Sequence, residues 1–214
     1  FEKRPDKTWN SWTNEGSRGF GMKRVDLNLG LGYTTVNVDL LVFRDEIAHY
    51  RMAARVGANE WPSHRAKVAE VWKESGGPPF QLDDNELVYE KYISEVWAEY
   101  YATISRELGP MKTVKVPDDL ADAYQLLTNP FENSSISMVA CSDGKPAIDA
   151  LEDSKRIDLI ENVLRGYNPG GRIYAAISLL RMERKGRKLS RSTKAAITKV
   201  VNLDATVSTC WGDV

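Results

Sequence analysis

Few residues of this chain could do chemistry, because it contains only two histidines, His49 and His64. An enzyme that uses histidine as a general base would have to use one of them. Glu46 and His49 have the Glu-x-x-His spacing that places two ligands on one helical face, as in carboxylate-bridged di-iron bundles. Such a site also needs a second pair and two more glutamates, and Trp61, not a glutamate, stands three residues before His64. We therefore predict neither a metal site nor a cofactor.

Carboxylates offer a second route to chemistry. Asp83, Asp84, Glu86 and Glu90 crowd the start of a predicted long helix. Glu86 and Glu90 are the candidates for the paired acids of a glycosidase. Acids at a helix N-terminus also interact favourably with the helix dipole, which is a sufficient reason for their presence.

Two further groups are candidates for binding. Gly170, Gly171 and Arg172 open a predicted helix, where free backbone amides and a guanidinium could receive an anion. The alternative is a tight interhelical turn with a solvated or ion-paired arginine. Trp9 and Trp12 stand in a polar N-terminal stretch and either anchor a partner on the surface or fold back onto the core.

A basic run lies near the C-terminus. It could contact an acidic partner, although a solvated turn explains it equally well. Its members are Arg181, Arg184, Lys185, Arg187, Lys188 and Arg191.

Cys141 and Cys210 are the only cysteines. Cys210 lies four residues from the end, where a chain frays unless it is tied down. We predict a disulfide between them, which places the protein in the periplasm or outside the cell. Two reduced, buried cysteines, in a cytoplasmic protein, are the alternative.

The elements that must position these residues begin with strands. Apolar residues alternate over residues 25–31 and again, with shifted parity, over 36–42, which predicts an antiparallel hairpin. Residues 1–20 are expected to form an irregular arm. Residues 45–56 fit either a third strand or a short helix, and we favour the strand because an isolated hairpin is marginal.

The rest of the chain has helical periodicity. Proline, glycine and capping residues delimit the helices. The expected helices cover residues 62–74, 83–108, 117–127, 146–165, 172–185 and 190–201, and a short strand is expected at 206–209.

The predicted fold class is α+β, with an N-terminal antiparallel hairpin or meander followed by a mostly helical body that ends in a stack of short helices. Residues 1–75 would hold the arm, the strands and one helix, and residues 80–214 the helical body, within one integrated domain. The net charge of −1 argues against a nucleic-acid or membrane-surface binder. No apolar stretch is long enough to span a membrane.

These observations favour a non-catalytic extracytoplasmic binding protein that recognises a protein partner, in a toxin-neutralising or assembly role for example. The alternative is a carboxylate-dependent hydrolase such as a glycosidase. A homodimer through an exposed strand edge is a third hypothesis.

Overall fold

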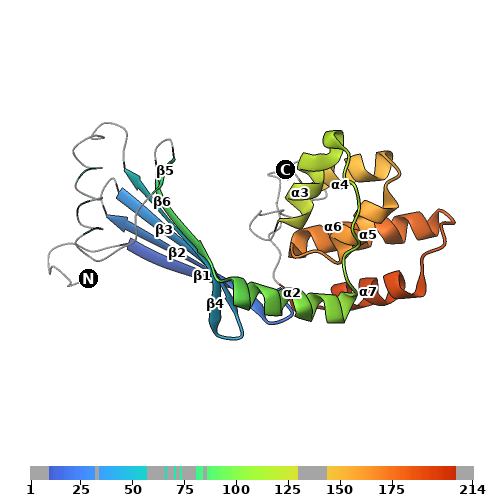
Figure 1. The fold of residues 1–214 in the computed structure, drawn as a ribbon, viewed down its shortest axis with the longest axis horizontal. Coiled ribbons are helices and arrows are strands. Elements are labelled where there is room, and N and C mark those ends of the chain that lie inside the picture. The colour runs from blue at the N-terminus through green and yellow to red at the C-terminus, as the bar shows by residue number, and fades with distance from the viewer. Residues whose placement is uncertain are drawn as a thin grey trace. The chain divides into compact units, whose positions relative to one another are not determined.

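The computed structural model of the chain describes residues 10–31, 34–56, 66, 70, 73, 81–83, 86–129 and 144–205. It confirms the α+β class, with strands first and helices after them (Figure 1). The described residues group into two compact units. One holds the sheet and the chain up to Trp97; the other holds the chain from Ala98 onwards together with the short segment Ser17–Gly21.

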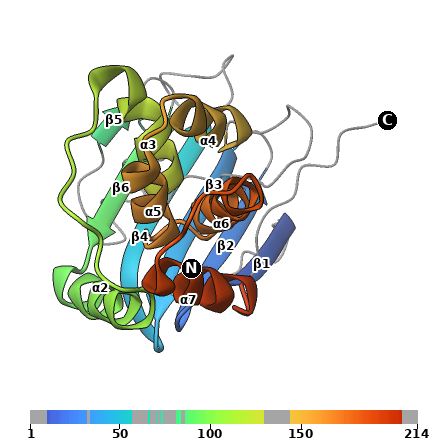
Figure 2. The same cartoon turned by 90° about the vertical axis from the view of Figure 1, so that its right-hand side faces the viewer.

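Within the described residues, six strands form one sheet in the order β1-β2-β3-β4-β6-β5 (Figure 2). Their bounds are β1 Asn10–Gly19, β2 Met22–Leu31, β3 Thr34–Phe43, β4 Glu46–Val56, β5 Gln81–Asp83 and β6 Glu86–Tyr92. The predicted hairpin is confirmed as β2 and β3, which pair antiparallel with Val25 opposite Leu40. The favoured strand over residues 45–56 is confirmed as β4, which pairs antiparallel with β3.

Two-residue turns explain how the first strands connect. Arg44 and Asp45, between β3 and β4, both have positive φ, at 50° and 69°. Phe20 and Gly21, between β1 and β2, do so as well, at 56° and 86°. Positive φ at both central residues is the turn geometry that matches the right-handed twist of paired strands.

The irregular arm expected over residues 1–20 is wrong for its second half, because Asn10–Gly19 is strand β1 at one edge of the sheet. Its polar sequence hid the strand, since an edge strand needs little apolar burial.

The long helix expected from residue 83 is also wrong in its first part. Residues Gln81–Asp83 and Glu86–Tyr92 are strands β5 and β6, and helix α2 covers only Ser94–Leu108. The segment that begins at Glu86 fits period 2 as well as period 3.6, and pairing with β4 decides in favour of the strand.

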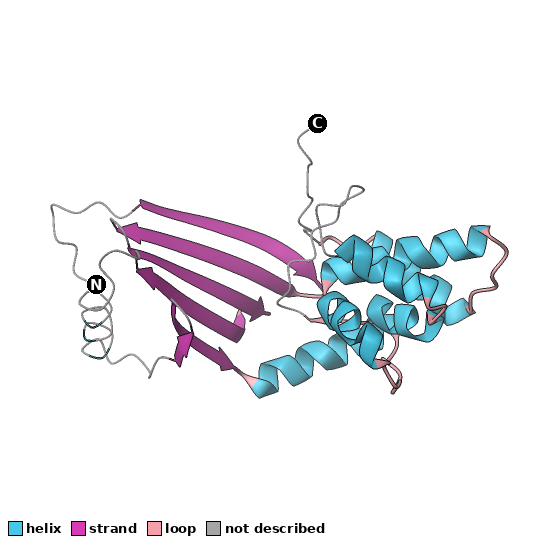
Figure 3. Ribbon diagram, turned by 90° about the horizontal axis from the view of Figure 1, so that it is seen from above, coloured by secondary structure: helices cyan, strands magenta, loops and turns pink. Residues whose placement is uncertain are grey.

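The remaining helices are α3 Ala121–Thr128, α4 Gly144–Asp153, α5 Ile157–Leu164, α6 Pro169–Arg184 and α7 Arg191–Val201, with a short 3-10 turn at Asp118–Leu120 (Figure 3). The single helix predicted over residues 146–165 is wrong. It breaks between α4 and α5, where Lys155 has a φ of 57°. The helices predicted near 117–127, 172–185 and 190–201 are confirmed.

Each unit has its own buried side chains. In the sheet unit, Met22, Phe43, Ala48 and Trp97 are at most 4% exposed. In the helical unit, six leucine and isoleucine side chains are fully buried, which gives α3, α4, α5 and α6 a common core. They are Leu127, Leu151, Leu159, Ile160, Leu164 and Leu179.

Of the helix predicted over residues 62–74, the structure describes only Ala66, Glu70 and Lys73, all helical and exposed. The strand predicted over 206–209 lies outside the described residues.

Candidate functional site

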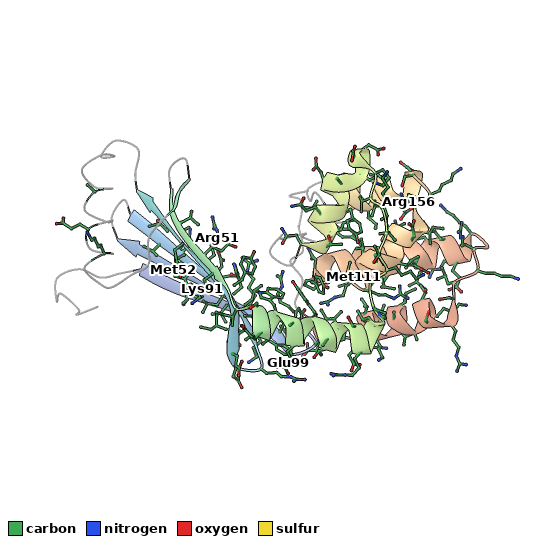
Figure 4. All side chains as sticks on the ribbon, in the orientation of Figure 1. Arg51, Met52, Lys91, Glu99, Met111 and Arg156 are labelled. Atoms are coloured by element: carbon green, nitrogen blue, oxygen red, sulfur yellow. The ribbon has the colours of Figure 1, made fainter. Side chains whose placement is uncertain are left out.

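The two faces of the sheet differ in chemistry. Residues paired across neighbouring strands share a face, so the registers assign each side chain. One face, the polar face, carries charged and amide side chains across four strands: Arg24, Asp26, Asn28, Asn37, Asp39, His49, Arg51 and Glu90. The same face also carries Met22, Leu41, Phe43 and Ala53, which are at most 4% exposed and belong to the core. The other, the apolar face, carries Val25, Leu27, Val36, Val38, Leu40, Val42, Tyr50, Met52 and Tyr89. Arg51 and Met52, neighbours on β4, belong to opposite faces (Figure 4).

The polar face holds a row of ion pairs. Arg24 donates to Asp26 on its own strand at 2.5 Å and to Asp39 on β3 at 3.1 Å. Arg51 on β4 lies 3.9 Å from the second oxygen of Asp39. Burial raises the pKa of the Asp26 carboxyl above its ordinary value, and the facing Asp39 adds to this effect while Arg24 opposes it. Two arginines thus neutralise two facing carboxylates.

His49 lies at one end of this face. Its side chain is 2% exposed, and its Nε2 lies 2.7 Å from a carboxylate oxygen of Glu90. The ring of Tyr92 packs against it, with centroids 4.4 Å apart. Burial lowers the pKa of His49, although Glu90 acts in the opposite direction. A neutral imidazole therefore donates its Nε2–H to Glu90 at neutral pH.

Burial limits what this pair can do chemically. A general base must reach the proton that it removes. The His49 ring is almost fully covered, so it positions Glu90 and Tyr92 instead of meeting a substrate. Glu90 itself has a side chain that is 39% exposed.

The predicted acids Glu86 and Glu90 both lie on β6, opposite Arg55 and Arg51 of β4, and not at a helix start. A separation of four residues along a strand puts their Cα atoms about 13 Å apart on the same face. The side chain of Glu86 is not described, so their joint action stays a prediction. Glu46 and His49 lie on strand β4 and not on a helix, which removes the helical reason for a shared ligand site. A register shift between them pairs Glu46 with Phe43 and His49 with Leu41 of β3, so both residues lie on the polar face.

The start of α6 is packed, not open. Asn168 caps the helix by accepting from the amide of Gly171 at 3.2 Å. A Cβ on Gly171 would stand 2.0 Å from the carbonyl oxygen of Leu127 in α3. Gly170 and Gly171 are buried, and their predicted role in anion binding remains untested.

Arg172 is 1% exposed and serves the fold. It donates to the carbonyls of Arg18 at 2.6 Å and Gly166 at 3.4 Å, and its guanidinium stands 5.1 Å from the centroid of the Phe20 ring. These contacts explain the residue without a ligand.

The side chains of the other predicted site residues are not described by the structure. Trp9, Cys141 and Cys210 lie outside the described residues, and Trp12 belongs to β1 but its side chain is not described. Among the residues that the structure describes, no three His, Cys, Asp or Glu side chains are close enough to hold a metal ion. Within the same residues, no helix has the length and hydropathy to cross a membrane.

Sequence reasoning missed the facing pair Asp26 and Asp39. The signal was present, because Asp26 and Asp39 stand equally far from Leu31 and Thr34, which face each other in the register. The hairpin was predicted without its register, and so the pair was not seen.

No protein-family model, no curated protein and no solved structure matches this chain.

Proposed function

We propose that the protein is a non-catalytic binding protein that recognises a protein partner, for example in neutralising a toxin or in assembly, and that it acts in the periplasm or outside the cell. The apolar face of the sheet is the observation that carries this proposal. An antiparallel sheet ordinarily packs its apolar face on a core and turns its polar face to water.

All nine of these side chains are half-buried, so each keeps part of its surface open to water, whereas Ala54 on the same face is 4% exposed. They continue across β2, β3, β4 and β6. Contiguous exposed apolar surface marks protein interaction sites. The polar face, in contrast, satisfies its own charges through Arg24 and Arg51.

The extent of the face suits a polypeptide. Four strand positions and the six-residue step from Val36 to Val42 span about 14 Å by about 20 Å. A small ligand is usually held in a concave site with a few convergent polar groups. Aliphatic side chains with tyrosine and methionine, rimmed by Lys23 and Lys91, have the composition of an interface centre and its polar edge.

Two matched variants test the proposal. Val38→Lys places a charge in the middle of the apolar face. Thr35→Lys places the same charge on the polar face of the same strand, where Thr35 is also half-exposed. We expect the wild-type protein to enhance the fluorescence of anilinonaphthalene sulfonate, and Val38→Lys, but not Thr35→Lys, to reduce that enhancement several-fold. Cross-linking in extract of the source organism should capture one protein with the wild type and with Thr35→Lys, and lose it with Val38→Lys.

Three results would overturn the proposal. If the wild-type protein does not enhance the fluorescence of the dye, another part of the chain covers the apolar face. If Val38→Lys cross-links to the same proteins as the wild type does, the partner does not bind at the apolar face. A dimer in sedimentation that only Val38→Lys dissociates would make a second copy the occupant.

A carboxylate-dependent hydrolase is the second candidate, supported by the exposed carboxylate of Glu90. Glu90→Gln should abolish any hydrolysis of chromogenic glycosides by the purified protein. Absence of hydrolysis by the wild type on a panel of glycosides would remove this candidate.

A further inference from the structure

The connection between α6 and α7 concentrates positive charge. Eight of the chain's 29 basic residues, but only one of its 30 acidic residues, fall in residues 181–199. Six of these cations lie within eleven residues, and we call them the basic turn: Arg181, Arg184, Lys185, Arg187, Lys188 and Arg191. All six are exposed. The connection lies at one end of the helical unit (Figures 1 and 3).

The backbone of the turn is held firmly. Gly186 takes a φ of 94° and donates its amide to Glu183 at 2.9 Å, while the amide of Arg187 donates to Met182 at 3.0 Å. Ser190 caps α7 by accepting from the amide of Thr193 at 3.0 Å. Arg181 and Arg184 in α6, Arg191 in α7 and the three cations between the helices therefore stand on a hydrogen-bonded backbone.

Helix stability accounts for only two of these six charges. Arg181 and Arg184 lie in the last turn of α6, where the helix dipole favours cations. Arg191 begins α7, where the dipole favours acids, and the first turn of α7 contains none. Arg187 and Lys188 crowd the same positive end.

The cations of the basic turn also differ from their neighbours in pairing. Lys194 pairs with Glu183, and Lys199 donates to Glu107 at 3.0 Å. No side chain of the basic turn forms an ion pair with another described residue. Six unpaired like charges repel one another, and a partner of opposite charge would relieve that repulsion.

The surroundings favour a compact carboxylate partner over a long polyanion. The neighbouring cations already pair with carboxylates, and the arginine fork fits a carboxylate in a bidentate manner. The rest of the chain is net acidic, because the whole carries −1, and it would repel a long nucleic acid or a broad anionic membrane. Residues 181–201 contain no aromatic side chain on which a base could stack.

We propose that the basic turn is a docking surface for an acidic segment of a partner protein. This surface is separate from the apolar face of the sheet and does not depend on the function proposed for that face.

A labelled deca-glutamate peptide tests the proposal by fluorescence anisotropy with the full chain. We expect saturable binding at an ionic strength of about 0.05 M that weakens strongly at about 0.5 M, as the Debye length shortens. The variant Arg184→Gln/Arg187→Gln/Lys188→Gln should bind about tenfold more weakly, since it removes three exposed ion pairs. The matched control Lys112→Gln/Lys115→Gln/Lys155→Gln loses the same charge from exposed lysines elsewhere in the helical unit and should bind as the wild type does.

Circular dichroism melts of both triple variants keep a folding defect apart from a binding defect. Absence of wild-type binding, or equal losses in the two variants, overturns the proposal. So does tighter binding to a 20-base-pair DNA duplex or to vesicles with one-third anionic lipid than to the peptide, because either result assigns the turn to another class of partner.

Discussion

Individual buried polar side chains hold segments distant in sequence together by hydrogen bonds. Arg172 ties the start of α6 to Arg18, far away in sequence, through a hydrogen bond of 2.6 Å. Asn162 likewise joins α5 to Lys112, accepting from its amide at 2.9 Å and donating to its carbonyl at 2.7 Å. Removing such a group leaves a buried backbone atom without its partner, which costs about 1–3 kcal/mol.

His49 makes the stability of the folded protein depend on pH. Its pKa is lowered in the folded state, so the unfolded chain binds the proton at a higher pH than the folded chain does. Its contribution to stability is present above its ordinary pKa of 6.5 and is lost as the pH falls below that value. We predict that urea unfolding between pH 7.5 and 5.5 shows a smaller loss of stability in His49→Gln than in the wild type. Equal losses in the two proteins would contradict the burial of a neutral imidazole.

At the scale of elements, close backbone approach decides where helices can pack. α3 and α6 meet at Gly171, where the carbonyl of Leu127 occupies the space of a side chain. Only glycine permits that approach. Packing therefore explains Gly171, which in the sequence alone resembles part of an anion-binding loop.

We predict that Gly171→Ala destabilises the protein by about 2–3 kcal/mol, because the clash is with backbone and not with a flexible side chain. Gly186→Ala is the matched control. Nothing lies within 4 Å of the Cβ added at Gly186. The variant should therefore lose only the stability that a side chain at positive φ costs, about 1 kcal/mol. Urea denaturation of the two variants measures the difference. A cost for Gly171→Ala no larger than for Gly186→Ala would refute the packing.

At the scale of the whole molecule, the chain builds two units, and one short N-terminal segment groups with the helical unit. Ser17–Gly21, which is the end of β1 and the turn after it, groups with the helices, although the rest of β1 and all of β2 belong to the sheet unit. The Ser17 hydroxyl donates to the carbonyl of Asp204 at 2.7 Å, close to the end of the described chain. The helical unit therefore needs a piece of the N-terminal sequence.

The disulfide predicted between Cys141 and Cys210 belongs to this scale, because it would close a long loop onto the helical unit. We predict that the native protein resists alkylation at both cysteines until a reductant is added, as mass spectrometry would show. Reduction should lower the stability by roughly 2–5 kcal/mol. Two thiols that alkylate without reductant would instead favour the cytoplasmic alternative.

The sequence by itself determined the class of fold, the β2–β3 hairpin, β4 and three of the later helices. These elements have strong periodicity or clear caps, such as Ser190 before α7. Tertiary structure decided the rest. Strand pairing made a strand of residues 86–92, whose pattern fits either period, and made β1 from a polar segment. The facing carboxylates, the buried His49 and the apolar face depend on strand register, which joins residues distant in sequence and is set by pairing rather than by local preference.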